Sequence, residues 1–211
     1  MTGDILLLTD THHRLAAEIT EKLRAAAKKR WMIAISGESG SGKSELSYAI
    51  ARRLKDNGLK AKIIHSDNFY VTHPDDRLRI RLERGIEKSV GPGEYDWESI
   101  RKVLQAFRKR KTVAMPCVDL LTNQVDTLFT DFSDISVLIL DGLYAIKAPG
   151  FDLRIFIDLT YHDTKKAQLL RGKEQPDMNR MKVLEAEHRA VRALKPKANI
   201  LIDATFRLHF L

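Results

Sequence analysis

The sequence predicts a three-layer α/β fold with a mainly parallel central sheet. Short apolar runs, typical of buried strands, alternate along the chain with longer amphipathic stretches that are typical of helices. Such alternation favours parallel strands joined by helices that cover both faces of the sheet. The 211 residues can bury a sizeable core and contain no repeat or low-complexity linker. We therefore expect one domain over 1–211, with an N-terminal helical extension at 1–30.

The elements follow from these patterns in chain order. Strands are expected at 31–36, 61–65, 112–118, 125–131, 137–140, 154–159 and 199–203. Helices are expected at 11–29, 43–57, 75–88, 97–110, 163–170 and 181–194. The strand at 112–118 contains Pro116, which favours an edge position, and it could form a short hairpin with 125–131. His12 and His13 are adjacent and point in different directions on a helix, so we interpret them as capping or surface residues.

Composition limits the functional classes. The formal charge is +8, from 36 Lys and Arg against 28 Asp and Glu, which suits either an anionic small substrate or a nucleic acid. We expect no nucleic acid partner, because the basic residues are spread along the chain without a stripe of interleaved aromatic residues. No apolar run is long enough for a membrane helix, and we expect no membrane partner. Cys117 is the only cysteine, so a cytoplasmic protein is the default expectation.

A glycine-rich stretch between the first predicted strand and its helix carries the strongest motif. Gly37-x-x-x-x-Gly42-Lys43-Ser44 matches the P-loop pattern, and its place between a strand and a helix is the one the motif requires. The glycines let successive backbone N–H groups point at phosphate oxygens. Lys43 would reach the β- and γ-phosphates, and the Ser44 hydroxyl would bind Mg²⁺. The expected nucleotide-binding residues are Gly37, Glu38, Ser39, Gly40, Ser41, Gly42, Lys43, Ser44 and Glu45.

Two carboxylates at strand ends are candidates for the chemistry. Asp141 follows four apolar residues, which fits a Walker B residue that holds Mg²⁺. Asp67 follows the strand at 61–65, where a carboxylate could accept the proton of a substrate hydroxyl and hold that hydroxyl for transfer. The alternative for Asp67 is a turn-forming role, and the alternative for Asp141 is simple strand termination. No Asn-Lys-x-Asp string for guanine recognition is present.

Two groups of cations are further candidates. Arg77, Arg81 and Arg84 lie near one face of the helix at 75–88, either facing a substrate or forming a solvated surface. The polar stretch at 171–180, interrupted by Pro176, suits a lid that closes over the transferring phosphate. Arg171 is its expected catalytic cation; whether Arg171, Lys173 or Arg180 contacts the phosphate is left open.

These residues resemble the phosphoribulokinase/uridine kinase family of P-loop kinases over roughly 30–203. The match includes the P-loop, the string Asp67-Asn-Phe-Tyr70, the pair Tyr95-Asp96, the block 111–119 and the strand that ends at Asp141. The resemblance implies a P-loop NTPase fold with a helical lid and a small β-hairpin that contacts the substrate. It also implies that Asp67 lies near the acceptor hydroxyl and that Tyr70, Tyr95, Asp96 and Asp119 contact the substrate.

The chain departs from the uridine kinase pattern in the acceptor region. The Tyr and His that grip the base in that family are replaced by Val118 and Asn123, and the Asp-His-Pro string appears as Val90-Gly91-Pro92. The arginine-rich lid string is also replaced, which leaves Arg171 as the best-matched cation. The machinery for phosphoryl transfer is therefore better matched than the pyrimidine-nucleoside pocket.

The sequence thus predicts a kinase that uses ATP and Mg²⁺ to phosphorylate a hydroxyl of a nucleoside-, sugar- or vitamin-like alcohol. The alternatives are an inactive nucleotide-binding regulator, which would need neither Asp67 nor the lid, and a basic nucleic-acid-binding ATPase. The choice between ATP and GTP as the phosphate donor is left open, as is the choice between a monomer and a homo-oligomer.

Overall fold

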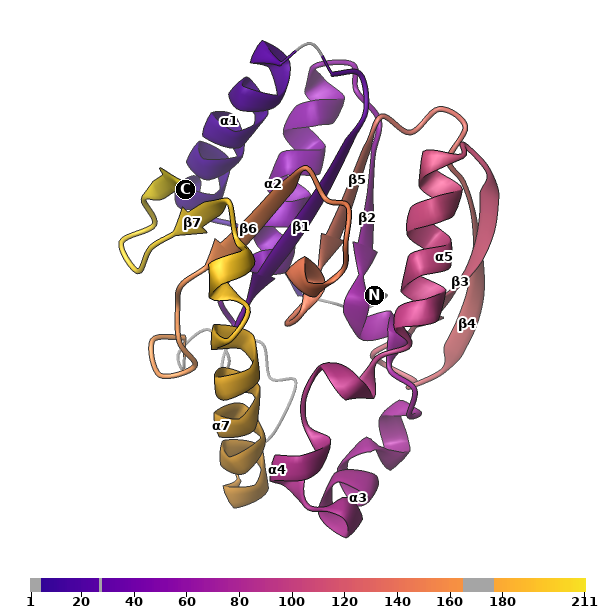
Figure 1. Cartoon of the computed structure of the whole chain (residues 1–211), viewed down its shortest axis with the longest axis vertical. Helices are drawn as coiled ribbons and strands as arrows, with labels where there is room; N and C mark the ends of the chain where they lie inside the picture. Colours follow the sequence, from indigo (N-terminus) through magenta and orange to yellow (C-terminus); the bar gives the residue numbers. More distant parts are fainter. Residues whose placement is uncertain (1–4, 27, 165–176) are drawn as a thin grey trace.

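The computed structural model describes residues 5–26, 28–164 and 177–211. Its centre is a six-stranded sheet in the order β2-β5-β1-β6-β7-β8 (Figure 1). The strands are β1 (Trp31–Gly37), β2 (Ala61–His65), β5 (Val137–Asp141), β6 (Leu153–Ile157), β7 (Ile200–Ile202) and β8 (Leu208–Phe210). Neighbouring strands run parallel except β7 and β8, which are antiparallel. The predicted α/β class and mainly parallel sheet are confirmed.

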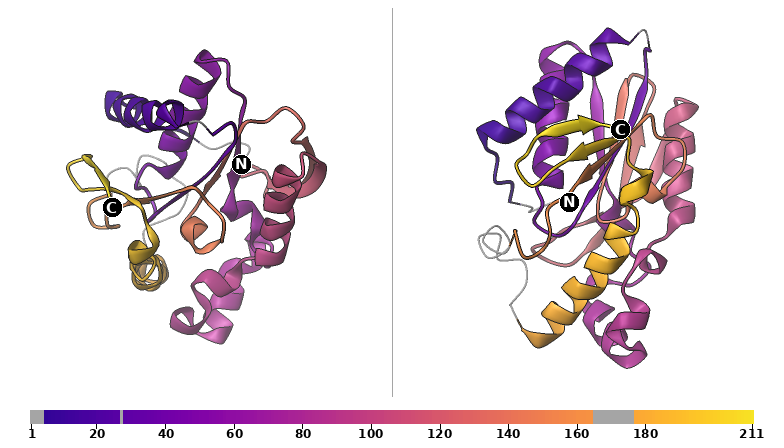
Figure 2. Two further views of the ribbon diagram at one scale, coloured as in Figure 1. Left: turned by 45° about the horizontal axis from the view of Figure 1, so that its top comes forward. Right: turned by 60° about the vertical axis from the view of Figure 1, so that its left-hand side comes forward.

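Helices cover both faces of the sheet, which gives the expected three layers (Figure 2). The helices are α1 (Asp10–Ala25), α2 (Lys43–Asp56), α3 (Pro74–Arg84), α4 (Ile86–Ser89), α5 (Trp97–Arg108) and α7 (Met178–Arg192). On one face, α1 and α2 pack on Ile33 and Ile35 of β1. On the other, α5 packs in a cluster with Met32 and Ala34. Alternate residues of β1 therefore enter opposite cores, as the two-residue period of a strand requires.

A separate antiparallel hairpin lies beside α5. It consists of β3 (Thr112–Val118) and β4 (Val125–Asp131), with Pro116 opposite Thr127. The predicted hairpin is confirmed, and its strands have the predicted bounds. No helix within the described part of the chain is long and apolar enough to cross a membrane.

Some boundaries differ from the sequence-based expectations. The helix expected at 75–88 is divided at Gly85, whose φ of 84° interrupts the helical backbone and separates α3 from α4. The short strand β8 was not predicted, because its three residues depend on pairing with β7. The first helix ends at Ala25 rather than near residue 29. Most of the helix expected at 163–170 lies outside the described residues.

The carboxyl ends of the parallel strands all lie at one edge of the sheet. The loops that follow β1, β2, β5 and β6 leave from this edge, which is where parallel α/β sheets bind ligands. In Figure 1, α3, α4 and α7 lie beyond this edge, below the sheet. A small apolar cluster of Ile86, Val90, Val183 and Ala186 joins α4 to α7. The fold thus places two helical segments around the strand ends.

Candidate functional site

The loop between β1 and α2 has the geometry expected of a P-loop. β1 ends at Gly37, and α2 begins at Lys43 after Gly42, whose φ is 91°. A Cβ on Gly37 would lie 2.7 Å from Ser41 Oγ and 2.9 Å from the carbonyl oxygen of Ile157, so only glycine fits there. The Lys43 ammonium donates a hydrogen bond of 2.7 Å to the Glu38 carbonyl oxygen, which folds the lysine back over the loop.

The N-terminal segment supports this loop from outside. The Leu7 N–H donates to Glu45 Oε1 at 3.1 Å, at the start of α2. His12 Nδ1 accepts a hydrogen bond from the Thr9 N–H at the start of α1, which confirms the capping interpretation. The same ring is 8% exposed, and its Nε2 lies 2.7 Å from where a Gly42 Cβ would be, whereas His13 is exposed. His12 is therefore a buried neighbour of the P-loop, which the sequence pattern did not reveal.

Asp141 ends β5, between the P-loop strand and β2. Its Oδ1 lies 2.7 Å from His65 Nδ1, and the residue is only 2% exposed. Its Oδ2 is buried and has no hydrogen-bond partner among the described residues. A buried carboxylate oxygen without a partner is costly, and a cation would satisfy it. The Asp141 carboxylate therefore fits a cation such as Mg²⁺, which often takes only one or two protein ligands.

The described residues contain no group of three or more His, Cys, Asp and Glu side chains that could hold a metal ion.

Asp67 lies in a short 3₁₀ turn (Ser66–Phe69) directly after β2. Its Oδ1 lies 3.3 Å from the hydroxyl of Tyr95, and that hydroxyl lies 2.7 Å from the hydroxyl of Tyr70. The turn is packed against the end of β5: a Cβ on Gly142 would lie 1.7 Å from Ser66 Oγ and 3.6 Å from Asp67 Oδ1. The missing side chain at Gly142 thus lets the Asp67 turn approach the strand that carries Asp141.

The three arginines that were predicted near one face of this helix make different contacts in the structure. Arg81 is buried and makes two hydrogen bonds to the Glu94 carboxylate, at 2.7 and 3.0 Å. Burial alone would lower the pKa of Arg81. The hydrogen bonds that Arg81 donates to Glu94, together with the nearby Tyr70, Glu94 and Glu187, outweigh burial, and the pKa is raised. The Arg77 guanidinium lies 3.6 Å from the centre of the Tyr70 ring. Arg84 is exposed. Of these three arginines, Arg77 is thus the one that contacts Tyr70, whose hydroxyl bonds to that of Tyr95 beside Asp67.

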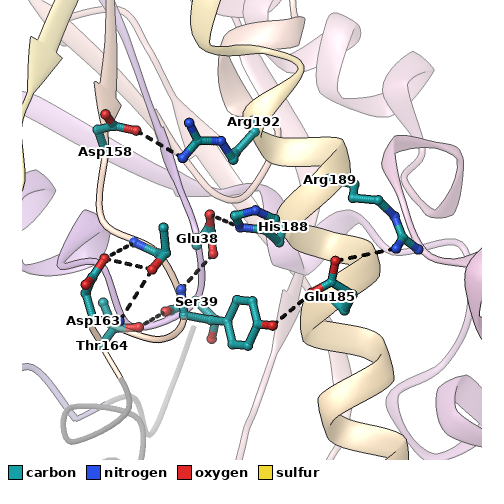
Figure 3. Close-up of polar contacts among 11 residues, drawn as sticks. Glu38, Ser39, Asp158, Asp163, Thr164, Glu185, His188, Arg189 and Arg192 are labelled. Atoms are coloured by element: carbon teal, nitrogen blue, oxygen red, sulfur yellow. Dashed lines mark hydrogen bonds and ion pairs between the residues drawn. The ribbon is translucent and has the colours of Figure 1, made fainter.

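Glu38, the second residue of the P-loop, connects the loop to two other segments (Figure 3). Its Oε1 lies 2.8 Å from His188 Nδ1 on α7, and its Oε2 accepts a 2.7 Å hydrogen bond from the Tyr161 N–H. The residue as a whole is 4% exposed. The Glu38 carboxylate therefore faces α7, which leaves the backbone of this expected nucleotide-binding residue for phosphate.

Ser39, the next residue, is contacted from both of the segments that flank 165–176. Its carbonyl oxygen accepts a hydrogen bond from Thr164 Oγ1 at 2.8 Å, and its hydroxyl lies 3.3 Å from the Arg180 guanidinium (Figure 3 labels Ser39 and Thr164). Arg180 is at the start of α7, and so α7 brings one predicted cation onto the P-loop. Arg171 and Lys173 lie outside the described residues.

Two of the residues expected to contact the substrate instead make hydrogen bonds to their neighbours in the chain. Asp96 caps α5, accepting hydrogen bonds from the N–H and hydroxyl of Ser99, which lower its pKa. Asp119 accepts a hydrogen bond from the Leu121 N–H in the turn of the hairpin. The structure groups Tyr70 and Tyr95 with Asp67, whereas Asp96 and Asp119 have local roles in an N-cap and a turn.

A parallel sheet whose first strand leads through Gly37-x-x-x-x-Gly42-Lys43-Ser44 into a helix is typical of a P-loop nucleotide-binding protein. The model of the "Phosphoribulokinase / Uridine kinase family" matches residues 32–206 of this chain. The chain belongs to this family, which is a family of kinases.

Individual relatives agree with this assignment. A uridine kinase of Ureaplasma parvum serovar 3 is 30% identical over 144 residues, covering 66% of this chain and 68% of that protein. The bifunctional alpha-galactosidase/sucrose kinase AgaSK of Mediterraneibacter gnavus is 24% identical over 202 residues, covering 90% of this chain and 22% of that protein. A solved structure described as a possible uridine kinase from Bacillus stearothermophilus has a TM-score of 0.62 at 19% identity, covering 91% of this chain and 97% of that one. This last similarity supports the fold alone.

Proposed function

We propose that this kinase transfers the γ-phosphoryl group of ATP to a hydroxyl of a small alcohol, with Asp67 as the base. The observation that carries the proposal is the meeting of two loops at one edge of the sheet. The P-loop follows β1, the Asp67 turn follows β2, and Asp141 ends β5 between them. A phosphate donor and an acceptor hydroxyl need to meet in this way for in-line transfer.

The nucleotide side uses the P-loop. Backbone N–H groups of residues 37–44 and the N-terminus of α2 would bind the phosphates, and Lys43 would exchange its bond to the Glu38 carbonyl for the β- and γ-phosphates. Ser44 and Asp141 would hold Mg²⁺, which neutralises charge on the phosphates when bound. The cation Arg180 would lie near the transferring group because it reaches Ser39. Arg171 remains the other proposed cation of this segment.

The acceptor side uses Asp67. Its ionised carboxylate would accept the hydroxyl proton as the acceptor oxygen bonds to the γ-phosphorus. The bond from that phosphorus to the β,γ-bridging oxygen breaks, and ADP leaves. A positioned base of this kind contributes about 10²–10⁴ in rate. Tyr70 bonds to the Tyr95 hydroxyl that reaches Asp67, and Arg77 lies over the Tyr70 ring. Tyr70 and Arg77 are proposed to contact the rest of the acceptor, with Asp96 and Asp119 as more distant candidates.

The acceptor class is proposed from the relatives and the departures together. The chain is more nearly identical to a named uridine kinase than to the bifunctional alpha-galactosidase/sucrose kinase, but the match to the bifunctional protein extends over more of the chain. Val118 and Asn123 replace the residues that grip a pyrimidine base in uridine kinases. We therefore propose a nucleoside-, sugar- or vitamin-like alcohol. With a single cysteine, Cys117, the protein suits a reducing compartment such as the cytoplasm.

A substrate-panel assay tests the proposal. ADP formation from ATP and Mg²⁺ would be measured with nucleosides, sugars including sucrose, and pantothenate-like alcohols. One class of acceptor should stimulate ADP formation, and a Lys43→Met variant should abolish the stimulation. ATP binding without stimulation by any member of the panel would contradict the proposal and would favour an inactive nucleotide-binding protein.

A further inference from the structure

A hollow of about 310 Å³ opens at the edge of the sheet opposite the P-loop, which is the upper edge in Figure 1. It lies at the first residues of β1 and β5, Trp31 and Val137, beside the ends of α1 and α2. Its floor continues the apolar core: Leu23, Leu54 and Val137 are buried, and Leu59 and Trp31 pack against that core. An apolar hollow of this volume is typical of small-molecule sites, and we call it the amino-edge pocket.

Three cations line the amino-edge pocket. Arg24 is in the last turn of α1, and Lys28 and Lys29 lie just before β1. Lys28 pairs with Asp152, and its ammonium lies 5.4 Å from the centre of the Trp31 ring. Arg24 and Lys29 are exposed, and their side chains make no ion pair or hydrogen bond to any other residue that the structure describes. Two cations beside an apolar floor are thus available to an anionic group.

A second basic stretch reaches the same edge of the sheet. The Arg30 guanidinium donates to the carbonyl oxygen of Ile135 at 3.0 and 3.2 Å, and Arg110 Nη1 donates to that of Ser133 at 3.2 Å. Both oxygens belong to the loop that leads into β5. Burial, and then the charge of Arg110, lower the pKa of Arg30, as expected where like charges gather. The positive field of these side chains would attract small anions to this edge.

We propose that the amino-edge pocket binds a small aromatic anion, in which a phosphate, sulfonate or carboxylate is attached to a flat apolar ring system. The rings would lie on the leucines of the floor, and the anionic group would lie between Arg24 and Lys29. An aromatic body is favoured because the half-buried Trp31 ring lines the pocket, and aromatic rings pack favourably against one another. The dipole of α1 would account for Arg24 but not for Lys29, which precedes a strand. The inference is independent of the proposed function, because no residue of the pocket belongs to the phosphoryl-transfer site.

The test compares two probes, 8-anilinonaphthalene-1-sulfonate and N-phenyl-1-naphthylamine, which has the same ring system without the sulfonate. Trp31 and Trp97 are the two tryptophans, so Trp31 is the only tryptophan donor of fluorescence energy in a Trp97→Phe background. Saturating ATP and Mg²⁺ would be present to occupy the P-loop. The anionic probe should quench Trp31 fluorescence with a Kd of about 10–100 µM. The neutral probe should bind about fivefold more weakly, because it makes no contact with the cations.

Charge variants locate the binding. Replacing both pocket cations, Arg24→Gln with Lys29→Gln, should weaken the anionic probe about fivefold and leave the affinity of the neutral probe within about twofold. Arg101→Gln is the matched control, because Arg101 is exposed on α5, which covers the other face of the sheet, and it should change neither affinity.

Four results would overturn the inference: no saturable quenching below about 1 mM, equal affinity for the two probes, an unchanged affinity in the double variant, or an equal loss in Arg101→Gln. If Trp97→Phe does not fold, the ¹⁵N indole signal of Trp31 in the otherwise natural chain, assigned by comparison with Trp31→Phe, would report the binding. A Trp31 signal that the anionic probe does not shift would then overturn the inference.

Discussion

Replacing His188 with alanine should destabilise the protein by leaving one oxygen of the buried Glu38 carboxylate without its hydrogen-bond partner. The side chain of Glu38 is 5% exposed and that of His188 25%, and their atoms are 2.8 Å apart. Leaving a buried polar group without its hydrogen-bond partner costs about 1–3 kcal/mol, and a carboxylate lies at the upper end of this range, about 3 kcal/mol. For a chain of this size, that loss lowers Tm by about 6–12 °C.

A double-mutant cycle isolates the pair. Urea denaturation and thermal melts would be recorded for wild type, His188→Ala, Glu38→Gln and the double variant. Glu38→Gln removes the charge that needs a partner, so the double variant should recover about 1.5 kcal/mol or more relative to the sum of the single variants. His162→Ala is a matched control, because His162 is exposed and stacks on Tyr161 at 4.0 Å without being a partner of Glu38 in the hydrogen bonds described. Additive losses in the cycle would refute the reasoning.

Three further variants test local features. Asp96→Ala should lower the free energy of unfolding by about 1 kcal/mol in urea, because α5 loses its cap, while Asp96→Asn should keep it; equal losses would argue against capping. Gly142→Ala should lower Tm and reduce turnover about tenfold or more, because the new Cβ would lie 1.7 Å from Ser66 Oγ and would displace the Asp67 turn. A stable and active variant would show that the turn can move without loss of function. His209 holds the pKa of Asp203 below its ordinary value, so this stabilisation is present above about pH 4 and is lost as pH falls further. Asp203→Asn should therefore lower Tm near pH 7, and the difference from wild type should shrink below about pH 4; a constant difference would exclude this linkage.

Much of the fold could be predicted from the sequence because its signals are local. The apolar strand before Gly37, the helix that begins at Lys43 and the β3–β4 hairpin each follow from patterns a few residues long, and the structure has all three. The break between α3 and α4 was missed, because the helical pattern of 75–88 outweighed a single glycine, Gly85. The strand β8 was missed because its pairing with β7 determines it.

The same holds for the site: the residues of a local motif could be predicted, whereas contacts between residues distant in the sequence could not. The P-loop is one continuous motif and could be predicted as a unit. The contact between Glu38 and His188 joins residues 150 positions apart, and the contact between Tyr95 and Asp67 joins residues 28 apart. Neither pair has a sequence spacing that indicates contact, and only the fold brings them together.

The most direct test of the account measures Asp67→Asn with the acceptor identified by the substrate panel. ATP affinity would be measured by isothermal titration calorimetry, and turnover by ADP formation. We expect an ATP Kd within about twofold of wild type and a fall in kcat of about 10²-fold or more, because only proton acceptance and acceptor positioning are lost. A variant that turns over within about twofold of the wild-type rate would contradict the account, because Asp67 would then have no part in the transfer.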